Sequence, residues 1–496
     1  MINIGNRREC FFDDFLLDLE KSTARRLMHK PTRRNVILNF DRDWEGGIVT
    51  YLSTFFVDGI WKCYYMTIPQ SDRLVCYMES RDGEVWTRPE LDIVEWNGSK
   101  KNNIILNLDA LAKLDFKAFD NMSVFYDKNP DCPENEKYKM VAWWGGHASL
   151  VYLSSADGLH FKNLRLITAD GEFDSQNVAF WSGTHEKYFC YYRGEHDPSE
   201  STPVMDKSYT DETARALFDP EKFIMREPGD GTLAFMRDVC AIDSTDFENW
   251  SERRRIEYNG TDFQMYTNCV FEYPRAPHIF VAFPLRYTER KSWTKNYDEL
   301  CGKEERLLRM KKSARGGLAI TDSLFMSSRD GYRFTKFDEA FIQPPPENPD
   351  SFVYGDTMAT PTLFEISSDI PGADNEYMIH VRESYRSSCA KLTKYTIRLD
   401  GFVSLHSGDE PCVAVTKEFT YSGEELYANI ATSARGSVYF TLISGDERYE
   451  SCETFGNSVD KRIRFDDDET VKKLSGKPVR LEMRLYDADL YSINFR

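Results

Sequence analysis

The chain has 496 residues, with 63 Lys and Arg against 81 Asp and Glu, which gives a formal net charge of −18 at pH 7. This acidity excludes nucleic acid and anionic membranes as main partners, because both bind basic surfaces. Aromatic residues make up 14% of the chain, which excludes a disordered protein and favours β-strands. The length predicts two domains.

The N-terminal residues 1–26 contain no apolar stretch of signal-peptide length before the first acidic residues. No segment approaches the roughly 18 uninterrupted apolar residues of a membrane helix. The 11 cysteines form no Cys-x-x-Cys pair. We therefore expect a cytoplasmic protein with reduced thiols, without a disulfide framework or a zinc site.

A short motif recurs along the chain and consists of Ser, any residue, Asp, then Gly or Phe, two further residues and an aromatic residue. Its copies span residues 80–86, 155–161, 244–250 and 328–334, with a degenerate fifth at 398–403. Asp-Gly suits a tight hairpin, and the Ser or Asp side chain can bind backbone amides. We therefore assign a structural role, not a chemical one, to Asp82, Asp157, Asp246, Asp330 and Asp400.

Each motif follows an alternating strand, and further upstream lies an apolar strand followed by a strand rich in Tyr or Phe. These upstream pairs span 54–57 with 61–65, 124–126 with 138–142, 178–181 with 188–192, 270–271 with 279–283, and 362–364 with 377–381. Five units of about four antiparallel strands predict an all-β fold, a five-bladed β-propeller over residues 1–407. A long β-sandwich with coincidental turns is the alternative.

Two insertions and a tail depart from the repeat. The insertions span 196–235 and 288–317, and the second is expected to be helical over 297–312. They are either solvated loops or lids at the mouth of the channel. From residue 408 onward, short alternating segments at 427–430, 438–442, 462–465, 479–485 and 490–495 are separated by turns. They predict a small C-terminal β-sandwich domain over 408–496.

The repeats, the tail and segments such as DDFLL, SRDGEVWTRPEL, FDSQNVAFW and GKPVRLEMRLYDADLYSINF resemble the five-bladed-propeller glycoside hydrolases of families 32 and 43. The nearest resemblance is to a large bacterial group related to family 32. It implies a β-propeller enzyme that hydrolyses O-glycosyl bonds. The Trp-Met-Asn-Asp-Pro-Asn-Gly, Arg-Asp-Pro and Glu-Cys motifs of family 32 are not intact, and Arg237-Asp238 keeps only the first two residues of the second. Substrate and stereochemistry are therefore not carried over.

In a propeller the innermost strand of each blade lines the channel, so residues just before these strands converge on one pocket. The five positions carry Glu45, Asp120, Asp174, Asp262 and Asp356. Part of the negative charge is therefore expected at one channel mouth. A glycosidase needs one carboxylic acid to protonate the leaving oxygen and a second carboxylate to activate water or attack the sugar. We predict Asp120, Asp174 and Glu45 as the catalytic residues.

Side chains beside these positions are predicted to bind the substrate. Amides offer paired donors and acceptors to hydroxyl groups, and aromatic rings can stack on sugars. Arginines after the second strands either pair with the channel acids or form an anion site for a uronate or phosphate. The predicted substrate-binding set is Asp43, Trp44, Asn121, Gln176, Asn177, Trp181, Arg193, Glu195, Tyr266, Asn268, Arg286, Asp356 and Arg382.

The sequence is compatible with three functions. The first is a glycosidase acting on oligosaccharides or small glycosides, furanosides included. The second is a glycoside phosphorylase that uses inorganic phosphate, and the third is a non-catalytic carbohydrate-binding propeller, which the missing family 32 motifs suggest. No cofactor is expected and no ligand spacing demands a metal, although a structural divalent cation in the acidic channel is left open, as is a homo-oligomer.

Overall fold

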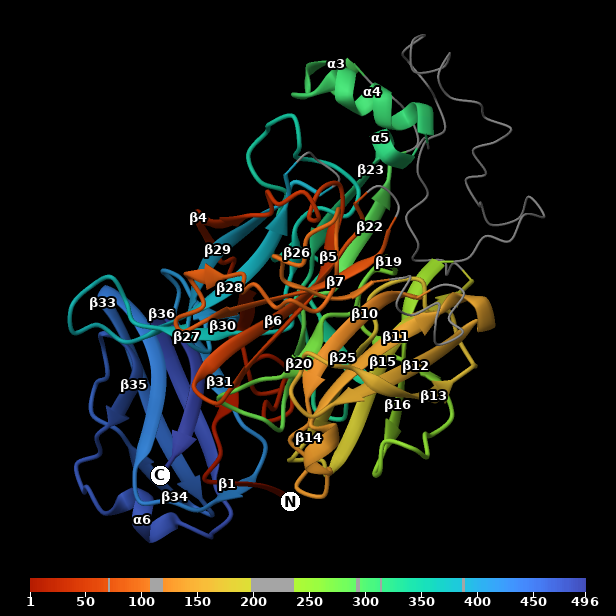
Figure 1. Cartoon of the computed structure of the whole chain (residues 1–496). Coiled ribbons are helices and arrows are strands. Elements are labelled where there is room, and N and C mark those ends of the chain that lie inside the picture. Colours follow the sequence, from red (N-terminus) through yellow and green to blue (C-terminus); the bar gives the residue numbers. More distant parts are fainter. Residues whose placement is uncertain (70–71, 108–118, 198–235, 291–294, 313–314, 386–388) are drawn as a thin grey trace.

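The computed structural model describes residues 1–69, 72–107, 119–197, 236–290, 295–312, 315–385 and 389–496 (Figure 1). The predicted all-β class is confirmed, because strands dominate this part of the chain. No helix among the described residues is long and apolar enough to cross a membrane.

The first two repeats each form one antiparallel sheet. The first sheet contains β5 (Val49–Val57), β6 (Ile60–Thr67), β7 (Leu74–Ser80), β8 (Trp86–Thr87) and β9 (Ile104–Asn107). The second contains β10 (Phe119–Tyr126), β11 (Tyr138–Trp144), β12 (Ser149–Ser155) and β13 (Lys162–Thr168), with the short 3₁₀ turns η1 (Glu134–Glu136) and η2 (Gly145–His147) between them. The first strands of the two sheets, β5 and β10, contact each other.

The third and fourth repeats form the next two sheets. The third contains β14 (Val178–Ser182), β15 (Lys187–His196), β16 (Met236–Ser244) and β17 (Arg254–Arg255). The fourth contains β18 (Glu257–Tyr258), β20 (Val270–Glu272), β21 (Phe280–Ala282), β24 (Met326–Ser328) and β25 (Arg333–Lys336). A separate three-stranded sheet contains β19 (Gln264–Met265), β22 (Leu285–Glu289) and β23 (Ala319–Ser323).

The fifth sheet joins the two ends of the repeat region. It contains β26 (Met358–Ala359), β27 (Phe364–Ile366), β28 (Glu376–Glu383), β29 (Lys391–Arg398) and β4 (Thr32–Asn39). Strand β4 comes from the N-terminal part of the chain and pairs antiparallel with β29. The predicted strand pairs are therefore present in all five sheets.

The repeated hairpins owe their shape to one set of hydrogen bonds. In the first copy the Ser80 hydroxyl donates to Asp82 Oδ1 at 3.0 Å and accepts from the Gly83 amide at 2.9 Å. Asp82 Oδ1 also accepts the amides of Glu84 and Val85, both at 2.8 Å. Corresponding contacts recur at 155–161, 244–250 and 328–334. The structural role predicted for these four aspartates is confirmed.

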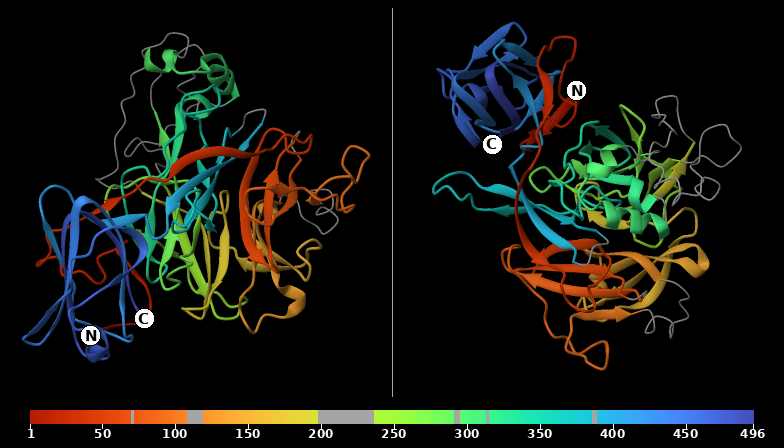
Figure 2. Two further views of the ribbon diagram at one scale, coloured as in Figure 1. Left: turned by 90° about the vertical axis from the view of Figure 1, so that its left-hand side faces the viewer. Right: turned by 90° about the horizontal axis from the view of Figure 1, so that it is seen from above.

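The C-terminal residues form one further sheet (Figure 2). It contains β30 (Val403–Ser407), β31 (Cys412–Val415), β33 (Leu426–Ser444), β34 (Glu447–Glu450), β35 (Asn457–Ile463) and β36 (Arg480–Phe495), with α6 (Thr470–Leu474) before β36. The segments predicted as separate strands at 427–430 and 438–442 belong to β33, whose pairing with β36 shifts register between Thr432 and Ser437. The two predicted segments 479–485 and 490–495 likewise merge into β36.

The N-terminal residues belong to this same C-terminal unit. Strands β2 (Glu9–Cys10) and β3 (Arg25–Met28) pair with β36 and β30, while β1 (Ile2–Gly5) pairs with β32 (Phe419–Tyr421). Phe11, Leu16 and Leu17 pack in its hydrophobic core. The predicted boundary between 407 and 408 assigns residues 1–28 and 403–407 to the repeat region, whereas β2, β3 and β30 pair within the C-terminal sheet and β1 pairs with β32 in a separate two-stranded sheet.

The second insertion is helical, but it is broken. It contains α3 (Lys295–Glu299), α4 (Lys303–Lys312) and α5 (Arg315–Leu318), where the sequence predicts one helix over 297–312. The break between α3 and α4 falls at Gly302, whose φ of +75° is a conformation that favours glycine. In Figure 1 these helices project above the sheets. Of the first insertion, residues 198–235 lie outside the described residues.

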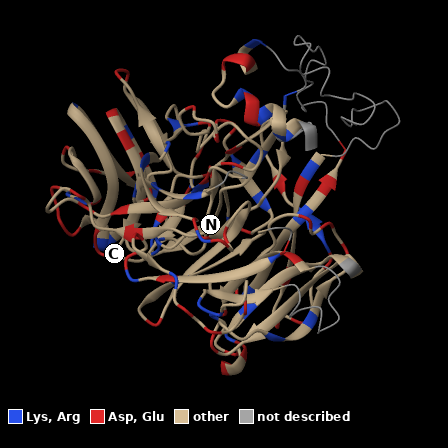
Figure 3. Cartoon of the chain, turned by 45° about the horizontal axis from the view of Figure 1, so that its top comes forward, with Lys and Arg blue, Asp and Glu red and all other residues tan. Residues whose placement is uncertain are grey.

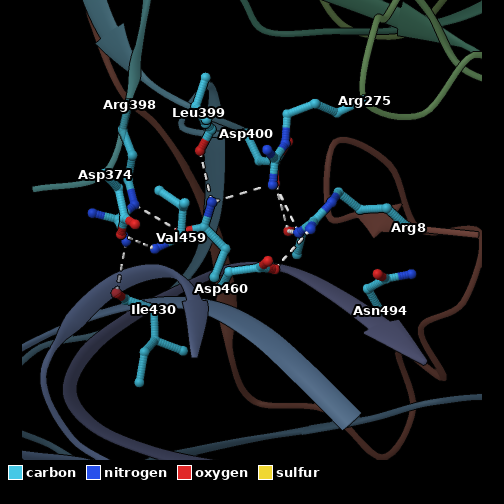
Figure 4. A network of polar contacts seen from close by, with 12 residues as sticks. Arg8, Arg275, Asp374, Arg398, Leu399, Asp400, Ile430, Val459, Asp460 and Asn494 are labelled. Carbon is cyan, nitrogen blue, oxygen red and sulfur yellow. Dashed lines mark hydrogen bonds and ion pairs between the residues drawn. The ribbon is translucent and has the colours of Figure 1, made fainter. Parts of the chain in front are cut away.

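A buried carboxylate connects the N-terminal segment, the repeats and the C-terminal sheet (Figure 4). Asp400 is 0% exposed and pairs with Arg8 and Arg275, each at 3.1 Å. It also accepts hydrogen bonds from the hydroxyls of Tyr273 at 2.6 Å and Ser492 at 2.8 Å. Burial alone would raise the pKa of Asp400, but Arg8 and Arg275 hold it below its usual value. Asp400 belongs to the degenerate fifth copy of the motif. There it pairs with two arginines and does not shape a hairpin as the other four aspartates do.

Asp400→Asn is expected to lower the free energy of unfolding by about 3–5 kcal/mol, because it removes the fully buried charge that pairs with the buried Arg8 and the half-buried Arg275. The pKa of Asp400 is lowered by folding, so its stabilising effect is present above the ordinary Asp pKa of about 3.9 and is lost as pH falls further. Urea unfolding at several pH values measures the difference. Glu450→Gln, which removes an exposed partner of Arg484, is the control, and an equal effect of both variants would contradict the role of Asp400.

Candidate active site

One cavity of about 380 Å³ brings together residues from all five repeats. It has two carboxylates, three arginines and a group of tyrosines. Its lining is Ile48, Thr50, Tyr51, Met66, Ile68, Arg73, Asp120, Asn121, Asp174, Arg193, Arg237, Tyr266, Tyr354 and Tyr385. Of the predicted site residues, the cavity therefore unites Asp120, Asn121, Asp174, Arg193 and Tyr266.

Asp120 and Asp174 are linked by the asparagine between them in the cavity wall. The register between β10 and β11 shifts from Asp120 to Ser123, and Asn121 has a φ of +51°. Such a bulge redirects side chains at the end of a strand. The Asn121 amide donates to Asp120 Oδ1 at 2.8 Å, and its Nδ2 lies 3.4 Å from Asp174 Oδ1. One residue thus orients both carboxylates.

The two carboxylates lie in different environments. Asp120 is only 8% exposed, and its Oδ2 accepts a hydrogen bond from Arg73 Nε at 2.6 Å. Burial raises the pKa of Asp120; Arg73 opposes this effect, and the nearby Asp174 adds to it. The Asp174 side chain is 65% exposed and lies 3.5 Å from Arg193. A buried acid with a raised pKa and an accessible carboxylate are the pair that acid–base chemistry requires.

Tyrosines form much of the remaining wall. The Tyr266 and Tyr354 rings are 5.1 Å apart, and the Tyr354 and Tyr385 rings 6.4 Å. Gly355, with a φ of +82°, allows the close approach of Tyr385, whose ring would lie 2.4 Å from a Cβ at that position. Burial raises the pKa of Tyr51 and of Tyr266, so their hydroxyls stay protonated and can donate hydrogen bonds.

Glu45 does not line the cavity. It is 1% exposed, and its carboxylate pairs with Arg88 at 2.7 Å and accepts a hydrogen bond from the Tyr65 hydroxyl at 2.5 Å. In the first sheet, Thr50 lies at the position that Asp120 has in the second sheet. The register between β5 and β6 shifts after Thr50, and Thr50 lines the cavity. The structure therefore places Glu45 in a buried ion pair that holds its loop.

The predicted amides Gln176, Asn177 and Asn268 connect neighbouring sheets. Asn177 Nδ2 donates to the Asn121 carbonyl at 3.0 Å. Gln176 Oε1 accepts the Cys269 amide at 3.0 Å, and Asn268 Nδ2 donates to the Gln176 carbonyl at 2.8 Å. These hydrogen bonds run between neighbouring sheets, and none of the three side chains lines the cavity.

Other predicted side chains also lie away from the cavity lining. Asp43 is on an exposed loop, Trp44 donates to Asn103 at 2.8 Å, and Trp181 packs edge-on against a neighbouring tyrosine. Arg286 pairs with Asp322, and its Nε donates to Oδ1 of that residue at 2.8 Å. Glu195 accepts a hydrogen bond from Arg193 Nη2 at 2.7 Å and thereby holds a lining residue without lining the cavity itself.

Asp356 and Arg382 lie beneath the tyrosine wall. Both are 0% exposed, and burial raises the pKa of Asp356 to about 7. The Arg382 guanidinium lies 4.0 Å from the centre of the Tyr385 ring and donates to the Val49 carbonyl at 3.2 Å. Asp262 is likewise bound elsewhere, with Oδ2 3.0 Å from His196 Nε2.

Five polar or aromatic residues line the cavity but are not among the predicted site residues. For Arg237, the incomplete Arg-Asp-Pro motif is a sequence signal that could have indicated a site residue. Arg73 lies directly before β7 and belongs to no recognisable motif. The complete set is Tyr51, Arg73, Arg237, Tyr354 and Tyr385.

The charge of the cavity differs from the expected accumulation of acids. Its lining contains three arginines and two aspartates, while Figure 3 shows acidic residues spread over strands and loops throughout the described chain. Within the described ranges, no group of three or more His, Cys, Asp and Glu side chains is arranged to hold a metal ion.

No protein-family model matches the chain, and no curated protein matches it either. Among solved structures, an N-acetylgalactosamine deacetylase from F. plautii in complex with blood group B trisaccharide is 11% identical, with a TM-score of 0.41 over 74% of this chain and 94% of that chain. A thermostable family-43 glycoside hydrolase is 10% identical, with a TM-score of 0.38 over 72% of this chain and 93% of that one.

A third solved structure represents the GH130 family of mannoside phosphorylases, which contains glycoside hydrolases that target β-1,2 mannosidic linkages in Candida mannan. It is 12% identical, with a TM-score of 0.38 over 75% of this chain and 94% of that chain. At these scores the similarity identifies none of the cavity residues.

Glu45→Gln is expected to lower the free energy of unfolding by about 3–5 kcal/mol, because a buried ion pair loses one charge. Asp120→Asn should cost much less, since burial already disfavours the Asp120 carboxylate. Thermal and urea unfolding measure both variants, with Glu95→Gln on an exposed loop as the control. If Glu45→Gln were as stable as the control, the structural role of Glu45 would be wrong.

Proposed function

We propose that the five sheets are the blades of a five-bladed β-propeller and that the cavity is the active site of a glycosidase. The proposed ring is supported by polar contacts between successive sheets, the last of which returns to the first. These contacts join Ser53 with Val124, Asn121 with Asn177, Gln176 with Cys269, Cys269 with Ala359, and Thr362 with Thr54. A tail of β-sandwich type completes the proposed architecture.

The carboxylate pair carries the functional proposal. Asp120, with its raised pKa, acts as the general acid that protonates the oxygen of the leaving group. Asp174, accessible from the cavity, is the carboxylate that activates water or attacks the anomeric carbon. Asn121 orients both groups, and Arg73 keeps the buried Asp120 paired when it is ionised after proton transfer.

The tyrosine wall supports a sugar as the occupant. Ring faces can pack against the apolar face of a pyranose or furanose, and phenol hydroxyls can bind its hydroxyl groups. Tyr51, Tyr266, Tyr354 and Tyr385 supply both kinds of contact within one cavity. The proposed substrates are small glycosides or the end units of oligosaccharides, and the proposed reaction requires no cofactor.

Asp120→Asn and Asp174→Asn are each expected to lower kcat/KM by about 10²–10⁴-fold, the usual contribution of a positioned acid or base. A screen of aryl glycosides and oligosaccharides, run with and without inorganic phosphate, identifies the substrate and separates hydrolysis from phosphorolysis. Asp170→Asn, an exposed aspartate, is the matched control. Full turnover by either active-site variant would contradict its assigned role.

The rate is expected to fall as pH rises through the pKa of Asp120, because a general acid works in its protonated form. Arg73 favours the carboxylate, so Arg73→Met should raise the pKa of Asp120 further and move the alkaline limb of the profile to higher pH. The profile of kcat/KM against pH measures this shift, with Arg253→Met as a control on the surface. An alkaline limb that stays in place in Arg73→Met would argue against Asp120 as the acid.

A further inference from the structure

One arginine of the cavity is not neutralised by any carboxylate in the part of the chain that the structure describes. Arg73 pairs with Asp120, and Arg193 pairs with Glu195 and approaches Asp174. Arg237 forms no ion pair with any described residue. Its Nη1 donates to the neutral Gln264 side chain at 2.7 Å, and its guanidinium lies 4.7 Å from the centre of the Tyr287 ring.

These contacts hold the Arg237 guanidinium in place without neutralising its charge. Gln264 occupies one donor, and the Tyr287 face supports the planar group from one side. A guanidinium held in this way presents its remaining N–H groups as a fork that matches a carboxylate in two parallel hydrogen bonds. Asp120 offsets the charge of Arg73 and Glu195 that of Arg193, so Arg237 is the lining arginine whose charge no described carboxylate offsets by an ion pair.

We propose that the cavity selects glycosides that carry a carboxylate, that is, uronic acid residues, and that Arg237 binds this carboxylate. The proposal rests on the proposed function and adds the substrate class. A uronate brings one negative charge, which matches the single guanidinium of the cavity that forms no ion pair with a described residue. Inorganic phosphate brings up to two, and the second would be repelled by the Asp120 and Asp174 carboxylates in the same cavity.

The test measures binding separately from catalysis. Isothermal titration of Asp120→Asn protein compares methyl glucuronide with methyl glucoside, and methyl galacturonide with methyl galactoside. At least one uronide is expected to bind about 10–100-fold more tightly than its neutral counterpart, the range of a charged hydrogen-bonded contact. Adding Arg237→Gln should abolish this preference while leaving neutral-sugar affinity unchanged, and Arg237→Lys should restore part of it.

The controls separate the possible failures. Arg253→Gln, on the surface, should keep the preference, and unchanged thermal unfolding shows that Arg237→Gln is folded. Equal binding of uronides and neutral sugars, no measurable uronide binding, or tighter binding of inorganic phosphate at Arg237 would overturn the proposal. A uronide preference without any turnover in the wild-type protein would instead refute the glycosidase function and leave the carboxylate site standing.

Discussion

The buried Asp400 carboxylate is the interaction on which the assembly of the chain depends. It receives Arg8 from the N-terminal segment, Arg275 and Tyr273 from the fourth repeat, and Ser492 from the last strand. A charge taken out of water is tolerated only when partners surround it, so these distant segments must meet for any of them to be satisfied. The same N-terminal segment then continues into β4 and completes the fifth sheet, which joins the first and last parts of the repeat region.

The inner ends of the sheets use their polar side chains for two different tasks. Gln176, Asn177 and Asn268 bind the backbone of neighbouring sheets and so hold the inner strands together. Bulges at Thr50 and Asp120 instead direct side chains into the cavity, where Tyr51 and Asn121 both have positive φ. Backbone strain of this kind persists only where the surrounding structure enforces it, and here the cross-links between the sheets provide that support.

The two aspartates of the cavity lie in different environments. Asp120 is buried and its pKa is raised, whereas the Asp174 side chain is exposed, and this difference is the basis of the proposed division of roles between acid and carboxylate. The protein as a whole is strongly acidic, yet the cavity lining has more arginines than aspartates. The Arg237 guanidinium, which forms no ion pair with a described residue, is the physical basis for the proposed preference for an acidic sugar.

The sequence by itself determined the all-β class, the strand pairs and the hairpins, because alternation and the Ser-x-Asp-Gly motif act through local hydrogen bonds. It also identified Asp120, Asn121, Asp174, Arg193 and Tyr266, since each lies beside the start or end of a recognisable strand. Only the tertiary structure decided that Glu45 is buried against Arg88, that Asp400 is an ion-pair centre, and that Arg73 and Arg237 enter the cavity. These outcomes depend on which side chains from distant segments meet in space, and no local pattern in the chain encodes that encounter.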